Sequence, residues 1–325
     1  MKDFPRKLAL SLLFGLAIIA ALALFADLPK TLAALAHFVW GYLPAVLGLT
    51  LLNYVLRFLK WHFYLHTIGA RNVGLRQSAG IWVAGLSMAM TPGKAGELFK
   101  SFLLMEASGL GMSTSAPVIV AERLTDGIAM LLLATAGLGF YAPARPVLAL
   151  ILAAALGLIL AVQIRPLAEW ALGLAARVPL LGRHGGALRN LYESSYRLLT
   201  WKNLLLAVGI GVVSWGGECF AFYLVLRGLG LAPSSDLLLA AAFILAFASL
   251  VGAVSALPGG LGAAETSITG LLLLLVTPSR DLAVAATLLI RLCTLWFGVG
   301  LGLATLMVLY RQLLFGGQSS VTSSP

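Results

Sequence analysis

The chain has 325 residues, of which 60% are hydrophobic and only 10% are charged. Soluble globular domains carry about 25% charged residues, so this composition excludes a soluble domain and indicates one polytopic membrane domain. The formal net charge is +10. Its basic residues collect at the ends of apolar runs, where they set membrane orientation and meet anionic lipid headgroups, so nucleic acid is not an expected partner.

Six apolar runs are long enough to span a membrane core of about 30 Å. They cover residues 8–26, 40–60, 118–140, 147–163, 203–226 and 283–310. The first run follows Lys2, Arg6 and Lys7, as the apolar core of a signal peptide would. Because it is longer than the usual signal core of about 7–15 residues, we interpret it as an uncleaved first transmembrane helix rather than a cleaved signal.

Two further apolar runs, 78–105 and 237–276, are each interrupted by a Pro-Gly break. Proline removes a backbone donor and glycine loosens the chain, so each helix should stop or kink there. The first run is too short for two spans and predicts a re-entrant hairpin of two half-helices. The second is either a similar hairpin or a full span over about 237–257 followed by a returning half-helix. The predicted helix-break residues are Pro92, Gly93, Gly96, Pro258, Gly259, Gly260 and Gly262.

The two breaks belong to a longer repeat. Glu97 follows the first break and Glu265 the second, and each is followed 26 residues later by an arginine, Arg123 or Arg291. This spacing predicts an internal duplication with halves at about 50–140 and 215–310. Paired broken helices in the two halves of a membrane protein are the best sequence pointer to a transport site.

The charge distribution predicts the orientation. Residues 165–202 carry six basic side chains against two acidic ones, so this segment and both termini are expected on the cytoplasmic side. Apolar residues among those charges predict amphipathic helices on the inner membrane face over about 164–202. If both broken runs are hairpins, the two halves have inverted topology. The polar tail, 316–325, is predicted to be disordered.

The predicted fold is therefore an all-α polytopic membrane protein with about six full spans. Two re-entrant or broken helical hairpins form an inverted repeat within a single domain, 1–315, in the inner (cytoplasmic) membrane. Non-helical backbone at membrane depth survives only where protein or a water-filled cavity satisfies its polar groups. The breaks thus predict a cavity.

Nine ionisable residues fall in the part expected within the membrane. Each unpaired charge costs about 2.5–3.5 kcal/mol there, and the total would exceed the usual net stability of about 5–15 kcal/mol. They are therefore either structural ion pairs between helices or the lining of a polar substrate path, and their clustering at the breaks favours the path. The candidate substrate-binding residues are Lys94, Glu97, Lys100, Glu122, Arg123, Asp126, Glu265 and Arg291; the ninth is Glu218.

No catalytic or metal-binding constellation is expected. Residues 92–96 resemble a phosphate-binding loop but lack the full Walker pattern, so nucleotide hydrolysis is not predicted. Amides at a half-helix N-terminus nevertheless attract anions, and Lys94 adds to that attraction. His62 and His66 have metal-ligand spacing without a nearby acidic third ligand. Cys219 and Cys293 lie in apolar runs and imply neither a disulfide framework nor a metal site. No metal or other cofactor is predicted.

Three motifs, at residues 91–97, 122–126 and 257–265, carry a resemblance to a known family. Together they resemble the flippase-like transmembrane domain of lysylphosphatidylglycerol synthases, over about residues 5–315. Bifunctional members of that family also carry a soluble aminoacyl transferase domain. Here only a short tail follows Tyr310, so the resemblance implies the lipid-moving half without synthase activity. Stand-alone relatives are associated with varied lipids, including hopanoids and glycolipids.

The predicted function is a lipid flippase or transporter that moves a polar or charged headgroup across the cytoplasmic membrane, through a site between the repeats. The expected partners are membrane lipids, anionic or phosphate-containing. The basic site residues would hold a phosphate, and the acidic ones would balance them, bind a cationic headgroup or carry a coupling proton. Arg57 and Lys60 either receive the headgroup at the inner surface or anchor the helix end. The alternatives are a transporter of a soluble ion or metabolite, and a non-catalytic scaffold for a lipid-modifying enzyme.

Overall fold

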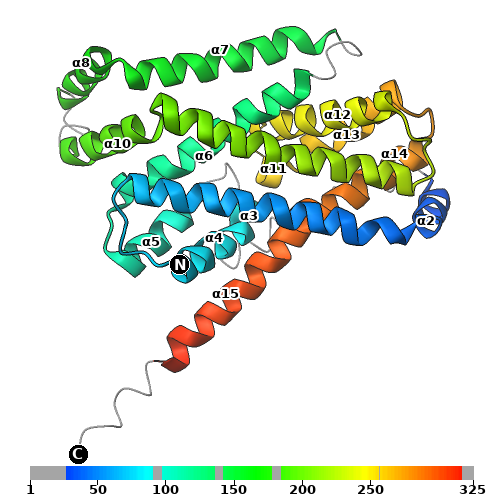
Figure 1. Ribbon diagram of the computed structural model, residues 1–325, viewed down its shortest axis with the longest axis horizontal. Helices are drawn as coiled ribbons and strands as arrows, with labels where there is room; N and C mark the ends of the chain where they lie inside the picture. Colours follow the sequence, from blue (N-terminus) through cyan, green and yellow to red (C-terminus); the bar gives the residue numbers. More distant parts are fainter. Residues whose placement is uncertain (1–26, 91–96, 136–141, 178–183, 256, 317–325) are drawn as a thin grey trace, which may run out of the picture.

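The computed structural model describes residues 27–90, 97–135, 142–177, 184–255 and 257–316. The predicted helix at 8–26 lies outside these residues, as do the tail from 317 onward and four predicted site or break residues, Pro92, Gly93, Lys94 and Gly96. Every regular element of the described chain is a helix (Figure 1).

The first half contains α2 (Leu28–Ala36), η1 (Trp40–Tyr42), α3 (Leu43–Thr67), α4 (Leu75–Leu86), η2 (Ser87–Met90), α5 (Phe99–Ser108) and α6 (Met112–Ala134). The middle contains α7 (Ala144–Gln163), α8 (Arg165–Ala176) and α10 (Gly185–Leu198). The second half contains α11 (Trp201–Gly228), α12 (Ser235–Val254), η5 (Pro258–Gly260), α13 (Ala263–Leu275), α14 (Arg280–Arg291), the π-helical turn η6 (Leu292–Trp296) and α15 (Phe297–Gly316).

Six segments of the described chain are long and apolar enough to cross a membrane. They are Trp40–Thr67, Ala144–Gln163, Trp201–Gly228, Ser235–Val254, Pro258–Leu275 and Arg280–Val308. The prediction of an all-α polytopic membrane protein is therefore confirmed. Four of the predicted runs are in this set. Both parts of the second broken run, α12 and the arm that begins at Pro258, also qualify as spans. The predicted span in α6 does not, because Glu122, Arg123 and Asp126 lie within it, and the run 8–26 lies outside the described residues.

Helices α3 and α11 are equivalent elements of the two halves. With η1, α3 forms a segment of 28 residues, the length of α11. Both end in the same motif, a left-handed glycine with φ of 94° at Gly69 and 92° at Gly230, followed by an amide that bonds back to the helix. This motif aligns the two helices at a separation of 161 positions. They pack together and run in opposite directions (Figure 1).

The helices beside the breaks complete an inverted repeat. Within each half the arms of the break pack together, α4 on α5 and α12 on α13. Across the halves, α4 packs on α15 and α12 packs on α6, so each hairpin contacts the last helix of the other half. Such reciprocal packing is expected of elements related by a two-fold axis. The described helices thus form two helical hairpins in an inverted repeat.

The two hairpins differ in size. The arms of the first, α4 and α5, have only 12 and 10 residues, about half of the roughly 20 residues that a spanning helix needs. In the second, α12 has 20 residues and α13 has 13, so α12 matches the alternative of a full-length helix with a returning arm. The serine caps at Ser234 and Ser279, which accept from Leu237 N and Leu282 N, explain where α12 and α14 begin.

The predicted linker is helical. α8 and α10 pack on each other at one end of α7 (Figure 1). Arg165 joins them, since its guanidinium lies 4.6 Å from the ring centroid of Tyr196 and 3.8 Å from a carboxylate oxygen of Glu193.

Candidate functional site

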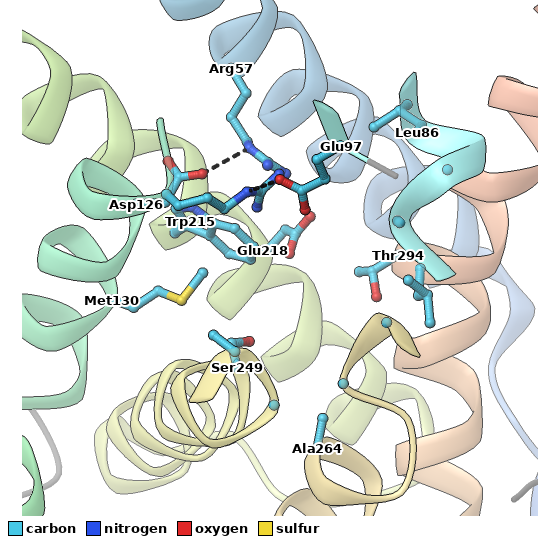
Figure 2. A pocket seen from close by; sticks show the side chains of 18 of the residues that line it. Arg57, Leu86, Glu97, Asp126, Met130, Trp215, Glu218, Ser249, Ala264 and Thr294 are labelled. Atoms are coloured by element: carbon cyan, nitrogen blue, oxygen red, sulfur yellow. Dashed lines mark hydrogen bonds and ion pairs between the residues drawn. The ribbon is translucent and has the colours of Figure 1, made fainter. Parts of the chain in front are cut away.

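A cavity of about 420 Å³ lies between the two halves. Its wall includes residues of α3, α4 and α6 from the first half and of α11, α12, η5 and α15 from the second. Figure 2 shows Arg57, Glu97, Asp126 and Glu218 gathered on one side of it, with Ser249 and Ala264 opposite. Among the described residues, the charged lining consists of Arg57, Glu97, Lys100, Arg123, Asp126, Glu218 and Arg291.

At this cavity the second break lies beside η2, the turn that precedes the first break. Gly259 of η5 lies beside η2, because a Cβ added to Gly259 would be 3.6 Å from the carbonyl oxygen of Ala89. Both residues line the cavity. The prediction that irregular backbone at the breaks accompanies a cavity is confirmed for the second break; the first break itself lies outside the described residues.

The duplicated glutamate–arginine pairs form as predicted from their spacing. Arg123 Nε lies 2.6 Å from Glu97 Oε2, and Arg291 Nε lies 2.6 Å from Glu265 Oε1. The pairs differ in exposure: the Arg123 side chain is 36% exposed and the Arg291 side chain only 16%. Equivalent positions therefore present one accessible and one sequestered arginine.

The second pair also holds the broken backbone. Arg291 Nη2 donates to Gly259 O at 3.0 Å, and Glu265 Oε2 accepts from Gly262 N at 2.7 Å. Gly259, Gly260 and Gly262 have φ of 60°, 67° and 85°, a region that favours glycine. Glu265 does not line the cavity, although it was predicted to bind substrate. Its contacts are those of a residue that positions Arg291 and the break.

Asp126 forms ion pairs with two cationic side chains. Lys60 Nζ donates to Asp126 Oδ1 and lies 3.3 Å from Thr125 Oγ1, while Arg57 Nε lies 3.3 Å from Asp126 Oδ2. The Arg57 guanidinium also lies 5.1 Å from the ring centroid of Trp215. The prediction that Lys60 is at the inner surface, as a receptor or an anchor, is wrong. Its side chain is 0% exposed, because α3 continues for almost two more turns to Thr67.

Lys100 and Glu122 form a buried pair that joins α5 to α6. Lys100 Nζ lies 2.7 Å from Glu122 Oε2, and Trp82 Nε1 donates to Glu122 Oε1 at 3.4 Å. The stem of Lys100 crosses α4 at Gly85, where a Cβ would lie 2.5 Å from Lys100 Cγ. Glu122 is 1% exposed and is not part of the cavity lining. Its contacts support the structural interpretation of this pair.

Glu218 was counted among the intramembrane charges but not among the predicted site residues. It lines the cavity and is 5% exposed. Tyr54 was also missed; its hydroxyl donates to Thr294 O at 2.6 Å, within the π-helical turn after Arg291. The signal that identifies Glu218 is the separation of Gly69 and Gly230, because the same separation of 161 positions relates Arg57 to Glu218.

Metal binding gains no support from the described residues, which contain no cluster of three or more His, Cys, Asp or Glu side chains placed to hold an ion. The rings of His62 and His66 meet edge to face, with centroids 4.6 Å apart.

The fold and the cavity define a class: a multi-pass membrane protein whose inverted repeats enclose a charged cavity. Residues 12–302 match the family described as the lysylphosphatidylglycerol synthase TM region, and the chain belongs to this family.

Two UPF0104 membrane proteins of Methanothermobacter thermautotrophicus (strain Delta H) are similar to the chain. One is 34% identical over 111 residues, a match that covers 34% of this chain and 31% of that protein. The other is 25% identical over 276 residues, covering 76% of this chain and 79% of its own length.

Proposed function

We propose that this protein moves the polar headgroup of a membrane lipid across the bilayer through the cavity between its inverted repeats. The observation that carries the proposal is the position of the cavity. It lies where the break of one half meets the other half, and its walls come from both halves. Transporters with inverted repeats bind their substrates at such an interface, near discontinuous helices.

The lining suits a charged headgroup. Arg123 is the candidate for first contact with a phosphate, because its side chain is the most exposed of the paired cations around the cavity. A guanidinium binds phosphate oxygens through two parallel hydrogen bonds, and Glu97 keeps this guanidinium in place. Apolar residues such as Leu86, Leu245 and Leu295 complete the wall. Membership of a family named after a lipid-modifying enzyme supports a lipid substrate over a soluble ion or metabolite.

We propose that the lipid is moved by a rocking of the two halves, which is coupled by the packing of each hairpin on the other half. Each hairpin contacts the last helix of the other half, so rocking one half against the other changes both sets of contacts together. This motion would open the cavity to one side while closing it to the other, as in alternating access. We propose that α8 and α10 lie on the cytoplasmic face and that the first hairpin is re-entrant from that face, because basic residues concentrate in 165–202.

No covalent chemistry is part of the proposal. The described cavity lining contains neither histidine nor cysteine, and most of its charged side chains are in ion pairs. Thr294, a hydroxyl residue of the lining, donates to Ile290 O within its own helix.

The test is lipid movement by the purified protein in liposomes that contain fluorescent phospholipids, with a membrane-impermeant quencher added outside. We expect inner-leaflet label to become accessible faster than in protein-free vesicles, and Arg123→Gln to slow this. Arg71→Gln, at an exposed arginine outside the cavity, is the matched control. Uptake of a soluble solute without lipid movement would instead favour the ion or metabolite transporter, and neither activity would favour the scaffold.

A further inference from the structure

Glu218 is a buried carboxylate without a partner among the described residues. In the part of the chain that the structure describes, it makes neither a hydrogen bond nor an ion pair, although it is 5% exposed and lines the cavity. Nine other charged side chains lie buried or half-buried around or beside the cavity, and all of them are paired: Arg57, Lys60, Glu97, Lys100, Glu122, Arg123, Asp126, Glu265 and Arg291.

The two cavity arginines that could pair with Glu218 already have other partners. Arg57 contacts Asp126 and stacks on Trp215. Arg291 contacts Glu265 and donates to the backbone of Gly259. Among the described residues, Asp126 therefore has two cationic partners while Glu218 has none. An uncompensated buried carboxylate is costly, so this position favours either a proton or a positive charge from outside the described residues.

The cavity has room and complementary groups for that charge. Trp215 lies one helical turn before Glu218, and both it and Tyr54 line the cavity. Aromatic faces and a carboxylate together attract an ammonium group. Arg123, the accessible arginine of the same cavity, can take a phosphate. A purely anionic headgroup would instead bring a second negative charge beside Glu218, which like-charge repulsion disfavours.

We infer that Glu218 binds the ammonium group of a headgroup that also carries a phosphate, and so makes the cavity select zwitterionic over anionic phospholipids. The consequences of this inference for transport rest on the proposed function, whereas its consequences for lipid binding do not. The inference narrows the lipids predicted from the sequence, anionic or phosphate-containing, to phosphate-containing lipids that also carry an ammonium group.

The test compares phosphatidylethanolamine with phosphatidylglycerol. Both carry a phosphate, but only phosphatidylethanolamine carries an ammonium group. Purified protein is incubated with an equimolar mixture in detergent, and bound lipid is quantified by native mass spectrometry. Wild type should retain more phosphatidylethanolamine. Glu218→Gln, which keeps the shape and removes the charge, should lower the ratio of the two bound lipids about 10- to 100-fold, the range expected for a lost hydrogen bond between charged groups. Glu106→Gln, at an exposed glutamate of α5, is the control and should leave the ratio unchanged.

The same variants are then compared in liposomes with a fluorescent analogue of each lipid. Glu218→Gln should slow phosphatidylethanolamine and not phosphatidylglycerol. A bound-lipid ratio that Glu218→Gln leaves unchanged, in a protein that elutes as a single folded species, overturns the inference. So does a wild-type preference for phosphatidylglycerol, which would mean that Glu218 binds a proton instead. Selective binding without movement of either lipid would support the inference and overturn the proposed function.

Discussion

The two equivalent glutamates should differ strongly in their effect on stability. Glu265→Gln leaves Arg291 without its carboxylate partner in a site where the arginine side chain is only 16% exposed. Removing one partner of a buried ion pair costs about 3–5 kcal/mol, since it strands the other charge. Glu97→Gln leaves Arg123, whose side chain is 36% exposed and can be hydrated. Its loss should be nearer the 0–1 kcal/mol, roughly, of an exposed pair.

The expected difference in the free energy of unfolding is therefore about 2–5 kcal/mol, with Glu265→Gln the less stable variant. A glutamine at this position can still accept from Gly262 N, so the comparison isolates the charge. Glu265→Ala also removes the acceptor for that amide and should cost about 1–3 kcal/mol more. The measurement is denaturant titration in mixed micelles, followed by tryptophan fluorescence. Equal losses for Glu97→Gln and Glu265→Gln, or a larger loss for Glu97→Gln, would refute this reasoning from exposure.

Charge exchange tests the same pair independently. The single reversal Glu265→Arg should be worse than the exchange of Glu265→Arg with Arg291→Glu, because the exchange restores one positive and one negative charge. The exchange should recover only part of the stability. The new arginine cannot accept from Gly262 N, and the new glutamate cannot donate to Gly259 O. Full recovery would mean that the backbone contacts contribute little.

Four further predictions follow from particular positions. A cysteine in place of Gly185, in α10, should react with an impermeant thiol reagent only after the membrane is opened; reaction from outside intact cells would reverse the proposed orientation. Gly302→Ala should destabilise the protein by about 1–3 kcal/mol, as overpacking does, because the new Cβ would overlap the backbone nitrogen of Ser87. Gly48→Ala, a control in α3 with nothing within 4 Å of its added Cβ, should not; equal melting temperatures would disprove the close contact. Glu97→Gln should still fold but move lipid more slowly, and a normal rate in liposomes would remove Glu97 from the proposed path. Purified protein incubated with bilayer lipids should yield no altered lipid by mass spectrometry; a new lipid species would establish an enzyme.

Much of the architecture was predictable because it depends on local chemistry. The apolar runs predicted the helices, and the Pro-Gly-Gly segment predicted the second break where η5 interrupts α12 and α13. The equal separation of each glutamate from its arginine predicted both ion pairs. A helix followed by an adjacent antiparallel helix brings such residues together whenever the turn between the helices is similar. That information lies within a few tens of residues.

Lys60 shows where the local argument fails. A lysine followed by Trp61 and His62 is typical of the membrane interface, and the sequence offers no residue that ends the helix there. The structure extends α3 to Thr67 and buries Lys60 against Asp126, which lies on another helix 66 positions away. A hydropathy argument places a lysine at the end of a transmembrane helix unless a buried acidic partner is known. That partner is determined only by tertiary packing.

Glu218 was missed for a different reason, since the repeat does not have one constant offset. The glutamates at the breaks, Glu97 and Glu265, are 168 positions apart, whereas the ends of α3 and α11 are 161 apart. The difference arises between these landmarks, where α12 has 20 residues and α4 only 12. A comparison at the offset of the breaks therefore pairs the wrong residues in α3 and α11, and the relation of Arg57 to Glu218 is visible only once both helix ends are known.

The same alignment explains why the cavity is asymmetric although the fold is repeated. The helix-terminal glycines and the glutamate–arginine pairs are alike in the two halves. The groups that face the cavity differ. Arg57 corresponds to Glu218, and Asp126, which binds two cations, corresponds to Thr294, which accepts the hydroxyl of Tyr54. Because two-fold-related positions carry different charges, a headgroup with two charged groups would have a preferred orientation in the cavity. We therefore expect the transported headgroup to bind in one orientation, with its phosphate toward Arg123.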